Sequence, residues 1–316
     1  MDFLYFLEGL RTPWLDAVVS ALTHLGGETV FLVAALVVFW CVDKRQGYYL
    51  MSVGFLGYYL MSVGFLGTLV NQFLKITCRV PRPWVRDPNF TIVESARAEA
   101  TGYSFPSGHS TSSVGTFGVL ATETKNIWVR LICAALCFLI PLTRLYLGVH
   151  TPADVLVGSA IPLFFIILLR PFIFREEGRH MPKLMAAMLA LSLGFVLYME
   201  LYSFPANVDQ ENLASALKNS YTLLGALTGM LIVWQVDKKR DFSTAAPFRV
   251  QVLKVALGLV LVLAVKEGLK LPLEPLFKGH MAARAIRYCA VVVTAGIFWP
   301  MAFPWLQKLG TKKQSD

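Results

Sequence analysis

The sequence predicts an all-α protein, a polytopic bundle of transmembrane helices. Of its 316 residues, 56% are hydrophobic and only 16% are charged, and the mean hydropathy is +0.57. A soluble domain carries about 25% charged residues, so this chain has too few to cover a water-facing surface. Its apolar residues also form long runs, and about 20 such residues cross a hydrocarbon core of about 30 Å. A soluble globular protein and a disordered chain are both excluded.

The first 27 residues are the first element, and they are amphipathic rather than continuously apolar. Asp16 and His24 make this segment a poor transmembrane span, so we expect residues 1–27 to lie in the membrane interface. Glu8 and Arg11 interrupt the start of the chain, and this argues against a cleavable signal peptide.

Nine apolar segments follow, and each is a candidate transmembrane helix.

The charged residues in the turns between these segments predict the orientation of the chain in the membrane. Lys and Arg collect in alternate turns, and such turns are typically cytoplasmic. The net charge of +9 is therefore assigned to membrane topology, and no nucleic-acid partner is expected. The nine segments cover about residues 28–42, 47–74, 107–123, 128–143, 152–170, 182–202, 218–236, 250–268 and 285–305.

The two sides of the membrane can then be assigned. The opposite, extracytoplasmic face holds the long loop 75–106, the turn 144–151, and the loops 203–217 and 269–284. The basic residues of the cytoplasmic turns are Lys44, Arg45, Lys125, Arg130, Arg170, Arg175, Arg179, Lys183, Lys238, Lys239, Arg240, Arg249, Lys308, Lys312 and Lys313.

A repeat of ten residues extends the second apolar segment: residues 47–56 recur without change as residues 57–66. With both copies, a helix over 47–74 would be about 42 Å long, well over the thickness of the hydrocarbon core. The surplus copy is expected to tilt or to project on the cytoplasmic side, near Lys44. A recent tandem duplication and a sequencing error both explain the pattern.

Three clusters of polar residues occur at the membrane ends of the first five apolar segments, where such residues are costly and are interpreted as functional. The predicted topology brings them to one face at one depth. Together they supply three cations, two imidazoles and one carboxylate, a combination suited to a dianionic phosphate group. The clusters run from Lys75 through Arg82 to Pro83, from Pro106 through Ser107 and Gly108 to His109, and from Thr143 and Arg144 through His150 to Asp154.

Residue chemistry assigns each cluster a role. Arg82 and Arg144 offer planar forks that match phosphate oxygens, and Lys75 adds a point charge. Ser107 and Gly108 open a helix, whose free backbone N–H groups attract an anion. Asp154 lies four residues after His150, so its carboxylate can hold one ring nitrogen and leave the other free to attack phosphorus. His109 can then protonate the departing alkoxide. The cations would stabilise the transition state, so no metal or other cofactor is expected.

The pattern Lys75-x6-Arg82-Pro83, Pro106-Ser107-Gly108-His109 and Arg144-x5-His150-x3-Asp154 resembles the three signature motifs of type 2 phosphatidic acid phosphatases, the PAP2 superfamily. The resemblance covers roughly residues 13–170. It implies that His150 is a nucleophile that forms a phosphohistidine, that Asp154 orients it, and that His109 is the general acid. Lys75, Arg82, Ser107, Gly108 and Arg144 would hold the phosphate. The third motif opens with Thr143 where the family usually has Ser, and the repeat in the helix that carries Lys75 is a larger departure.

The expected function is therefore hydrolysis of a lipid phosphate at the extracytoplasmic face of a bacterial cytoplasmic membrane. Phosphatidic acid, phosphatidylglycerol phosphate and polyprenyl pyrophosphates such as undecaprenyl pyrophosphate are the expected substrates, with membrane lipids as the surroundings. Two alternatives stay open: a phosphotransferase that uses the same phosphohistidine, and a lipid transporter or flippase. The sequence does not predict the oligomeric state.

The expected domains are an interfacial segment at 1–27, a PAP2-like catalytic core at 28–175 and an additional transmembrane region at 176–316. The last region carries no motif that predicts a role. Its charged residues have two interpretations, either snorkelling at helix ends or a second polar pathway. They are Glu200, Lys254, Lys266, Glu267, Lys270, Glu274, His280 and Arg284.

Overall fold

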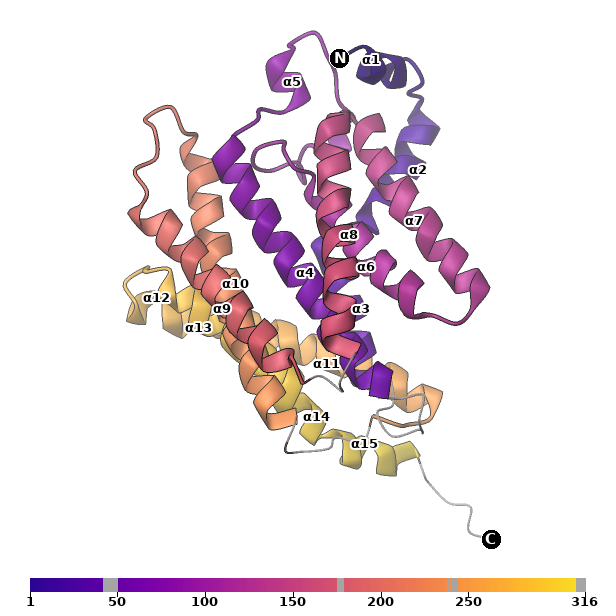
Figure 1. Ribbon diagram of the computed structural model, residues 1–316, viewed down its shortest axis with the longest axis vertical. Coiled ribbons are helices and arrows are strands. Elements are labelled where there is room, and N and C mark those ends of the chain that lie inside the picture. Colours follow the sequence, from indigo (N-terminus) through magenta and orange to yellow (C-terminus); the bar gives the residue numbers. More distant parts are fainter. Residues whose placement is uncertain (42–50, 175–178, 238, 240–243, 311–316) are drawn as a thin grey trace. The chain divides into compact units, whose positions relative to one another are not determined.

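The computed structural model describes residues 1–41, 51–174, 179–237, 239 and 244–310, and this part of the chain contains helices and no β-strand (Figure 1). The predicted all-α class is confirmed. The helices are α1 (Asp2–Glu8), α2 (Pro13–His24), α3 (Glu28–Cys41), α4 (Met51–Cys78), α5 (Pro83–Arg86), η1 (Glu94–Ala96), α6 (Gly108–Glu123), α7 (Ile127–Tyr146), α8 (Pro152–Phe174), α9 (Met181–Leu201), α10 (Gln210–Asp237), α11 (Phe248–Gly268), α12 (Lys270–Leu276), α13 (Ala282–Val293), η3 (Thr294–Phe298), α14 (Trp299–Met301) and α15 (Phe303–Gly310).

A helix forms at each of the nine predicted segments, and the described residues include six stretches long and apolar enough to cross a membrane. Three of the nine predicted spans are not among these six. The helices α3 and α6 have 14 and 16 residues, which is short for a span, and α10, although it has 28 residues, is not apolar enough. Together with α2, however, α3 meets the same criteria as one span bent by 44°. The chain is an integral membrane protein. The six stretches are Leu56–Arg86, Ile127–Tyr146, Pro152–Phe174, Met181–Leu201, Phe248–Leu276 and Ala282–Met301.

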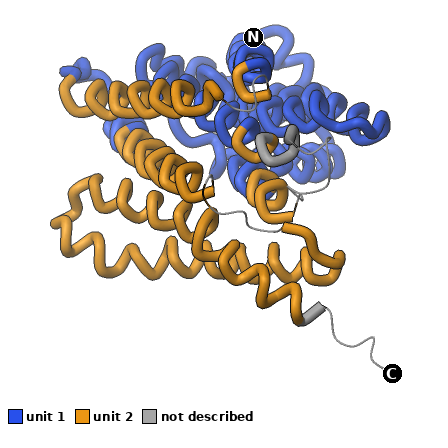
Figure 2. Tube along the Cα trace, turned by 60° about the horizontal axis from the view of Figure 1, so that its bottom comes forward, with its two compact units in different colours: residues 1–33, 59–171, 202–216 blue, residues 34–58, 172–201, 217–316 orange. Residues whose placement is uncertain are grey.

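The chain divides into two compact units, coloured differently in Figure 2. Unit 1 comprises residues 1–33, 59–171 and 202–216. Unit 2 comprises residues 34–58, 172–201 and 217–316. All three predicted polar clusters belong to unit 1. The charged residues of the C-terminal region for which the sequence predicts no role belong to unit 2.

The N-terminal segment packs on the rest of unit 1. Leu4 and Leu7 of α1 are buried against Phe90 and Leu145. Arg11 donates hydrogen bonds from Nε to the carbonyl of Tyr146 at 3.0 Å and from Nη1 to that of Thr91 at 2.9 Å. These contacts fix the long loop between α4 and α6 against the end of α7.

The helix α4 delivers Lys75 at its last turn, and its 28 residues correspond to about 42 Å. Within the second copy of the repeat, Tyr59, Leu60 and Val63 are fully buried, and the Tyr59 hydroxyl donates to the carbonyl of Ile166 at 2.7 Å. The second copy therefore supplies core packing. Residues 42–50, with Lys44 and the start of the first copy, lie outside the described residues, so the predicted projection stays a prediction.

Candidate active site

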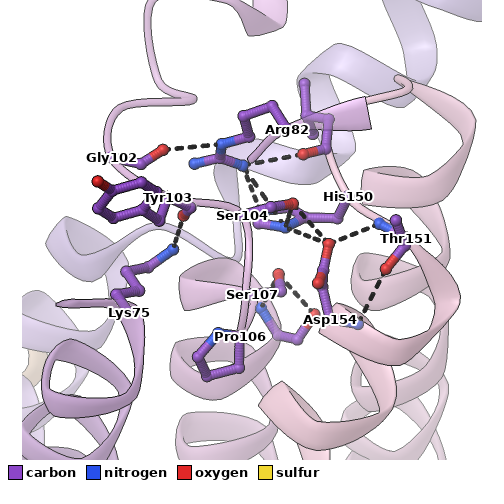
Figure 3. A network of polar contacts seen from close by, with 12 residues as sticks. Lys75, Arg82, Gly102, Tyr103, Ser104, Pro106, Ser107, His150, Thr151 and Asp154 are labelled. Atoms are coloured by element: carbon purple, nitrogen blue, oxygen red, sulfur yellow. Dashed lines mark hydrogen bonds and ion pairs between the residues drawn. The ribbon is translucent and has the colours of Figure 1, made fainter. Parts of the chain in front are cut away.

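The site is built around His150, in the turn before α8, and Asp154, in the first turn of α8 (Figure 3). Their side chains are 2% and 1% exposed. The turn that delivers His150 passes through Gly148 at φ +79°, a left-handed conformation that favours glycine. A Cβ there would lie 2.7 Å from Nη2 of Arg11 and 3.0 Å from the Thr91 carbonyl, so the close approach of these groups also requires glycine.

The carboxylate of Asp154 lies beside the imidazole of His150. Its Oδ2 accepts hydrogen bonds from the Ser104 hydroxyl at 2.6 Å and the Thr151 backbone N–H at 2.7 Å, and lies 3.5 Å from His150 Nδ1. On the other side of the ring, Nη1 of Arg82 lies 2.9 Å from His150 Nε2. A guanidinium only donates, so Nε2 is the acceptor, and this network assigns the ring proton to Nδ1, facing Asp154.

The charge state of His150 follows from its surroundings. Burial, and then the positive charges of Arg82, Lys75 and Arg144, hold the pKa of His150 well below its ordinary value. Cations of the first cluster, Lys75 and Arg82, and of the third, Arg144, therefore act on this one imidazole. At neutral pH the ring is therefore uncharged, with the Nε2 lone pair directed toward Arg82.

Arg82 is held rigidly. Its guanidinium donates to three carbonyls, at 3.1 Å to Gly102, 2.7 Å to Thr101 and 2.9 Å to Val149. Because two of these carbonyls belong to the long loop and the third precedes His150, one side chain ties the first and third clusters together (Figure 3).

Lys75 reaches the same loop from α4, where its Nζ donates to the carbonyl of Tyr103 at 2.6 Å. One turn earlier, Asn71 donates from Nδ2 to the carbonyl of Pro106 at 3.3 Å and to the Thr111 hydroxyl at 3.1 Å. The end of α4 is therefore fastened to the segment that opens α6.

Ser107 is the N-cap of α6, and its hydroxyl accepts a hydrogen bond from the backbone N–H of Ser110 at 3.3 Å. The Ser107 backbone N–H donates to the Asp154 carbonyl at 2.9 Å, which joins the second cluster to the third. A Cβ added to Gly108 would meet its nearest neighbour, Asn71 Oδ1, only at 4.0 Å. The first turn of α6 therefore leaves room beside its backbone.

Arg144 is fully buried at the end of α7. Its Nη1 donates to the Thr23 hydroxyl at 2.8 Å, but its Nε and Nη2 have no hydrogen-bond partner among the described residues. A buried guanidinium with unused donors is costly unless an anion pairs with it. Two parallel donors are the geometry that a phosphate oxygen pair accepts.

His109 is held by residues outside the three clusters. Its Nε2 lies 3.2 Å from one carboxylate oxygen of Glu99, whose other oxygen lies 2.8 Å from Nδ1 of His24. Sequence analysis missed Glu99, and it also missed Ser104 and Thr23, which contact Asp154 and Arg144. No group of three His, Cys, Asp or Glu side chains in the described part of the chain is arranged to hold a metal ion.

For the lipid phosphate hydrolysis expected from the sequence, we predict that Glu99→Gln lowers kcat about tenfold, because it weakens a charge-assisted contact to His109. Initial rates of phosphate release measure this effect. Glu94→Gln is the matched control, because Glu94 lies in the same loop but pairs with the exposed Arg97. Equal activity in the two variants would contradict a positioning role for Glu99.

Comparison with known proteins finds two family matches. The PAP2 superfamily profile matches residues 52–178, a range that contains all three clusters. The profile described as PAP2 superfamily phosphatase, transmembrane extension, matches residues 221–313. No solved structure matches the chain at a significant level.

Curated relatives are phosphatases of lipids. Phosphatidylglycerophosphatase B of Bacillus subtilis is 27% identical over 175 residues, which cover 52% of this chain and 77% of the relative. Lipid A 4'-phosphatase of Bacteroides thetaiotaomicron is 24% identical over 164 residues, 51% of this chain and 70% of the relative. Undecaprenyl-diphosphatase of Sulfolobus acidocaldarius is 42% identical over 59 residues, 18% of this chain and 28% of the relative.

Proposed function

Because the chain belongs to the PAP2 superfamily, we propose that it hydrolyses a lipid phosphomonoester or a lipid pyrophosphate through a phosphohistidine on His150. The observation that carries this proposal is the fully buried Arg144, whose Nε and Nη2 have no partner in the described part of the chain. An anion is the ligand that such a guanidinium requires. The neutral imidazole of His150 lies near the same cation.

The proposed reaction has two steps. In the first, a phosphate oxygen replaces Nε2 of His150 as the acceptor of the Arg82 hydrogen bond, and the freed Nε2 attacks phosphorus. The bond from phosphorus to the lipid oxygen breaks, and His109, which the bound dianion and the nearby carboxylate of Glu99 keep protonated, donates a proton to the departing oxygen. Asp154 stabilises the positive charge that the ring acquires. In the second step, His109 takes a proton from water, the water oxygen attacks phosphorus, and the phosphorus–nitrogen bond breaks to release phosphate and neutral His150.

The charge that develops on the phosphoryl oxygens is stabilised by the proposed phosphate-binding residues. Lys75, Arg82 and Arg144 supply three positive charges, and Ser107 and Gly108 supply the N-terminus of α6. These fixed cations support a reaction in which no divalent metal takes part.

We predict phosphate release in the presence of excess EDTA from at least one of three substrates: phosphatidic acid, phosphatidylglycerol phosphate and undecaprenyl pyrophosphate. The purified full-length protein is assayed in detergent, without any acceptor other than water. Loss of activity with EDTA that returns on adding a divalent metal would contradict the metal-independent mechanism. Release of phosphate only after a sugar or second lipid is added would identify a transferase instead.

We also propose that this site opens on the extracytoplasmic face of a bacterial cytoplasmic membrane. Arg130, in a turn predicted to be cytoplasmic, lies in the first turn of α7, whereas Arg144 of the third cluster lies in its last turn. A substrate in the outer leaflet would then reach His150 without crossing the membrane.

A further inference from the structure

We propose that unit 2 contains a second lipid site, which binds a phospholipid with an anionic phosphodiester head. The head would occupy a basic pocket at the start of α13, and the acyl chains would occupy an apolar groove beside it. None of the residues proposed for catalysis contributes to this site.

The groove has a volume of about 900 Å³ and lies among α9, α10, α11 and α13. Its lining is almost wholly aliphatic and aromatic, and Thr228 and Thr294 are its hydroxyl-bearing side chains. Leu193, Ile286 and Phe298 line it and are themselves exposed. Three of these helices, α9, α11 and α13, belong to stretches long and apolar enough to cross a membrane, and an open apolar groove among them fits hydrocarbon chains rather than a soluble ligand.

The basic pocket gathers four cations, Lys218, Lys270, Arg284 and Arg287, and one carboxylate, Glu274. With His280 neutral, its formal charge is 4 − 1 = +3. Arg284 and Arg287 make no ion pair with a carboxylate in the described part of the chain, so the positive charge is not neutralised within unit 2. This excess favours an anionic head over a zwitterionic one.

Arg287 points to a ligand most directly. The residue is only 9% exposed, and its Nε has no hydrogen-bond partner among the described residues. Its guanidinium lies 5.5 Å from the centre of the Tyr288 ring, and that of Arg284 lies 5.4 Å from the same ring. Two like charges one turn apart repel each other unless an anion lies between them. Arg284 also donates from Nε to the Thr222 hydroxyl at 2.6 Å, which holds it in place.

The pocket and the groove adjoin each other along three stretches of the chain. On α13, Arg284 and Arg287 of the pocket alternate with Ala285 and Ile286 of the groove. Leu269 of the groove immediately precedes Lys270 of the pocket. On α10, Lys218 lies six residues before Leu224, about 9 Å along the axis. One molecule with a charged head and apolar chains therefore matches both.

The floor of this site is built by close helix packing. A Cβ on Gly225 of α10 would clash with the carbonyl of Ala285, and one on Gly229 would lie 2.8 Å from the carbonyl oxygen of Cys289. Small residues four apart allow two membrane helices to approach in this way. The contact aligns α10 with α13 and so holds Lys218 and Arg287 at one end of the groove.

The test uses the full-length protein in phosphatidylcholine nanodiscs with a phosphatidylglycerol probe that carries a diazirine in an acyl chain. Phosphodiesters are not substrates of the proposed reaction, so the probe is not consumed. We expect photolabelled peptides from α10, α11 and α13, and competition by unlabelled phosphatidylglycerol. Arg287→Gln should reduce labelling about tenfold. Lys218→Gln, which changes an exposed lysine of the pocket, should also reduce it. Arg287→Lys should restore part of it.

Matched controls distinguish this site from bulk lipid. Lys278→Gln removes an exposed cation of the same turn outside the pocket, and it should leave labelling unchanged. Ala264→Trp should block the groove, whereas Leu263→Trp, next to it but outside the lining, should not. Equal competition by phosphatidylcholine, or labelling unchanged in both charge variants, would overturn the proposal. Equal competition by inorganic phosphate would show an ion site without a lipid and would overturn it too.

Discussion

Replacing His150 with alanine is expected to lower the rate of lipid phosphate hydrolysis by about 10⁴-fold or more, because the proposed nucleophile is lost. The neutral ring presents Nε2 beside Arg82 at 2.9 Å, while the carboxylate of Asp154 faces its other nitrogen at 3.5 Å. A water molecule that attacked phosphorus directly would lack the fixed position of this ring.

Two measurements check this expectation. Phosphate release gives the rate. Reactions with a substrate radiolabelled in the transferred phosphate, quenched in alkaline detergent, show whether a phosphorylated protein forms, because phosphohistidine survives in base. The wild type should carry acid-labile label, and His150→Ala should carry none. His180→Ala is the control, because that imidazole lies in unit 2 and contacts Phe172. Label that persists in His150→Ala, in a protein that melts like the wild type, would refute the phosphohistidine.

The parts of the site that sequence analysis predicted are those with a fixed local spacing. Asp154, in the first turn of α8, follows His150, in the turn before that helix, by four residues, so their contact is a local one. Lys75, Arg82 and Arg144 were predictable because cations at membrane depth are rare and costly. Long apolar runs also predicted the membrane helices. The segment predicted at 182–202, for example, is α9 at Met181–Leu201.

The residues that were missed reach the site through tertiary packing. Glu99 and Ser104 belong to the long loop between α4 and α6, and nothing in their neighbours' spacing distinguishes them from ordinary loop residues. Thr23 contacts Arg144 from 121 positions away. Helix boundaries were missed where polar residues continue a helix: α10 begins at Gln210, eight residues before the predicted start, because no apolar run marks its first two turns.

Thr23 also explains why the N-terminal segment matters to the site. Its hydroxyl accepts hydrogen bonds from both Thr143 at 2.9 Å and Arg144 Nη1 at 2.8 Å. One edge of the guanidinium is therefore anchored by α2, while Nε and Nη2 are left for a ligand. An arginine anchored on one side and unpaired on the other is arranged for binding rather than for folding.

Arg144→Met is the prediction that separates these two roles. The change keeps a long side chain but removes the charge, and it should lower kcat/KM by about 10³-fold, since a fixed donor to the transferring phosphoryl group is lost. Arg144→Lys keeps the charge but loses the planar fork of the guanidinium, so its kcat/KM should lie between those of the wild type and of Arg144→Met. The melting temperature of Arg144→Met should stay the same or rise, because an unpaired buried charge has been removed from the free protein.

Rates of phosphate release and thermal unfolding in the same detergent test both halves of this prediction. Arg130→Met is the control, because Arg130 lies exposed at the other end of α7 and donates to the Thr124 carbonyl. If Arg144 were a structural residue, Arg144→Met would lose stability and activity together, and inorganic phosphate would protect it as well as the wild type. If Arg144 binds phosphate, phosphate should raise the melting temperature of the wild type and of Arg130→Met but not of Arg144→Met, because only a ligand that binds the folded site stabilises it.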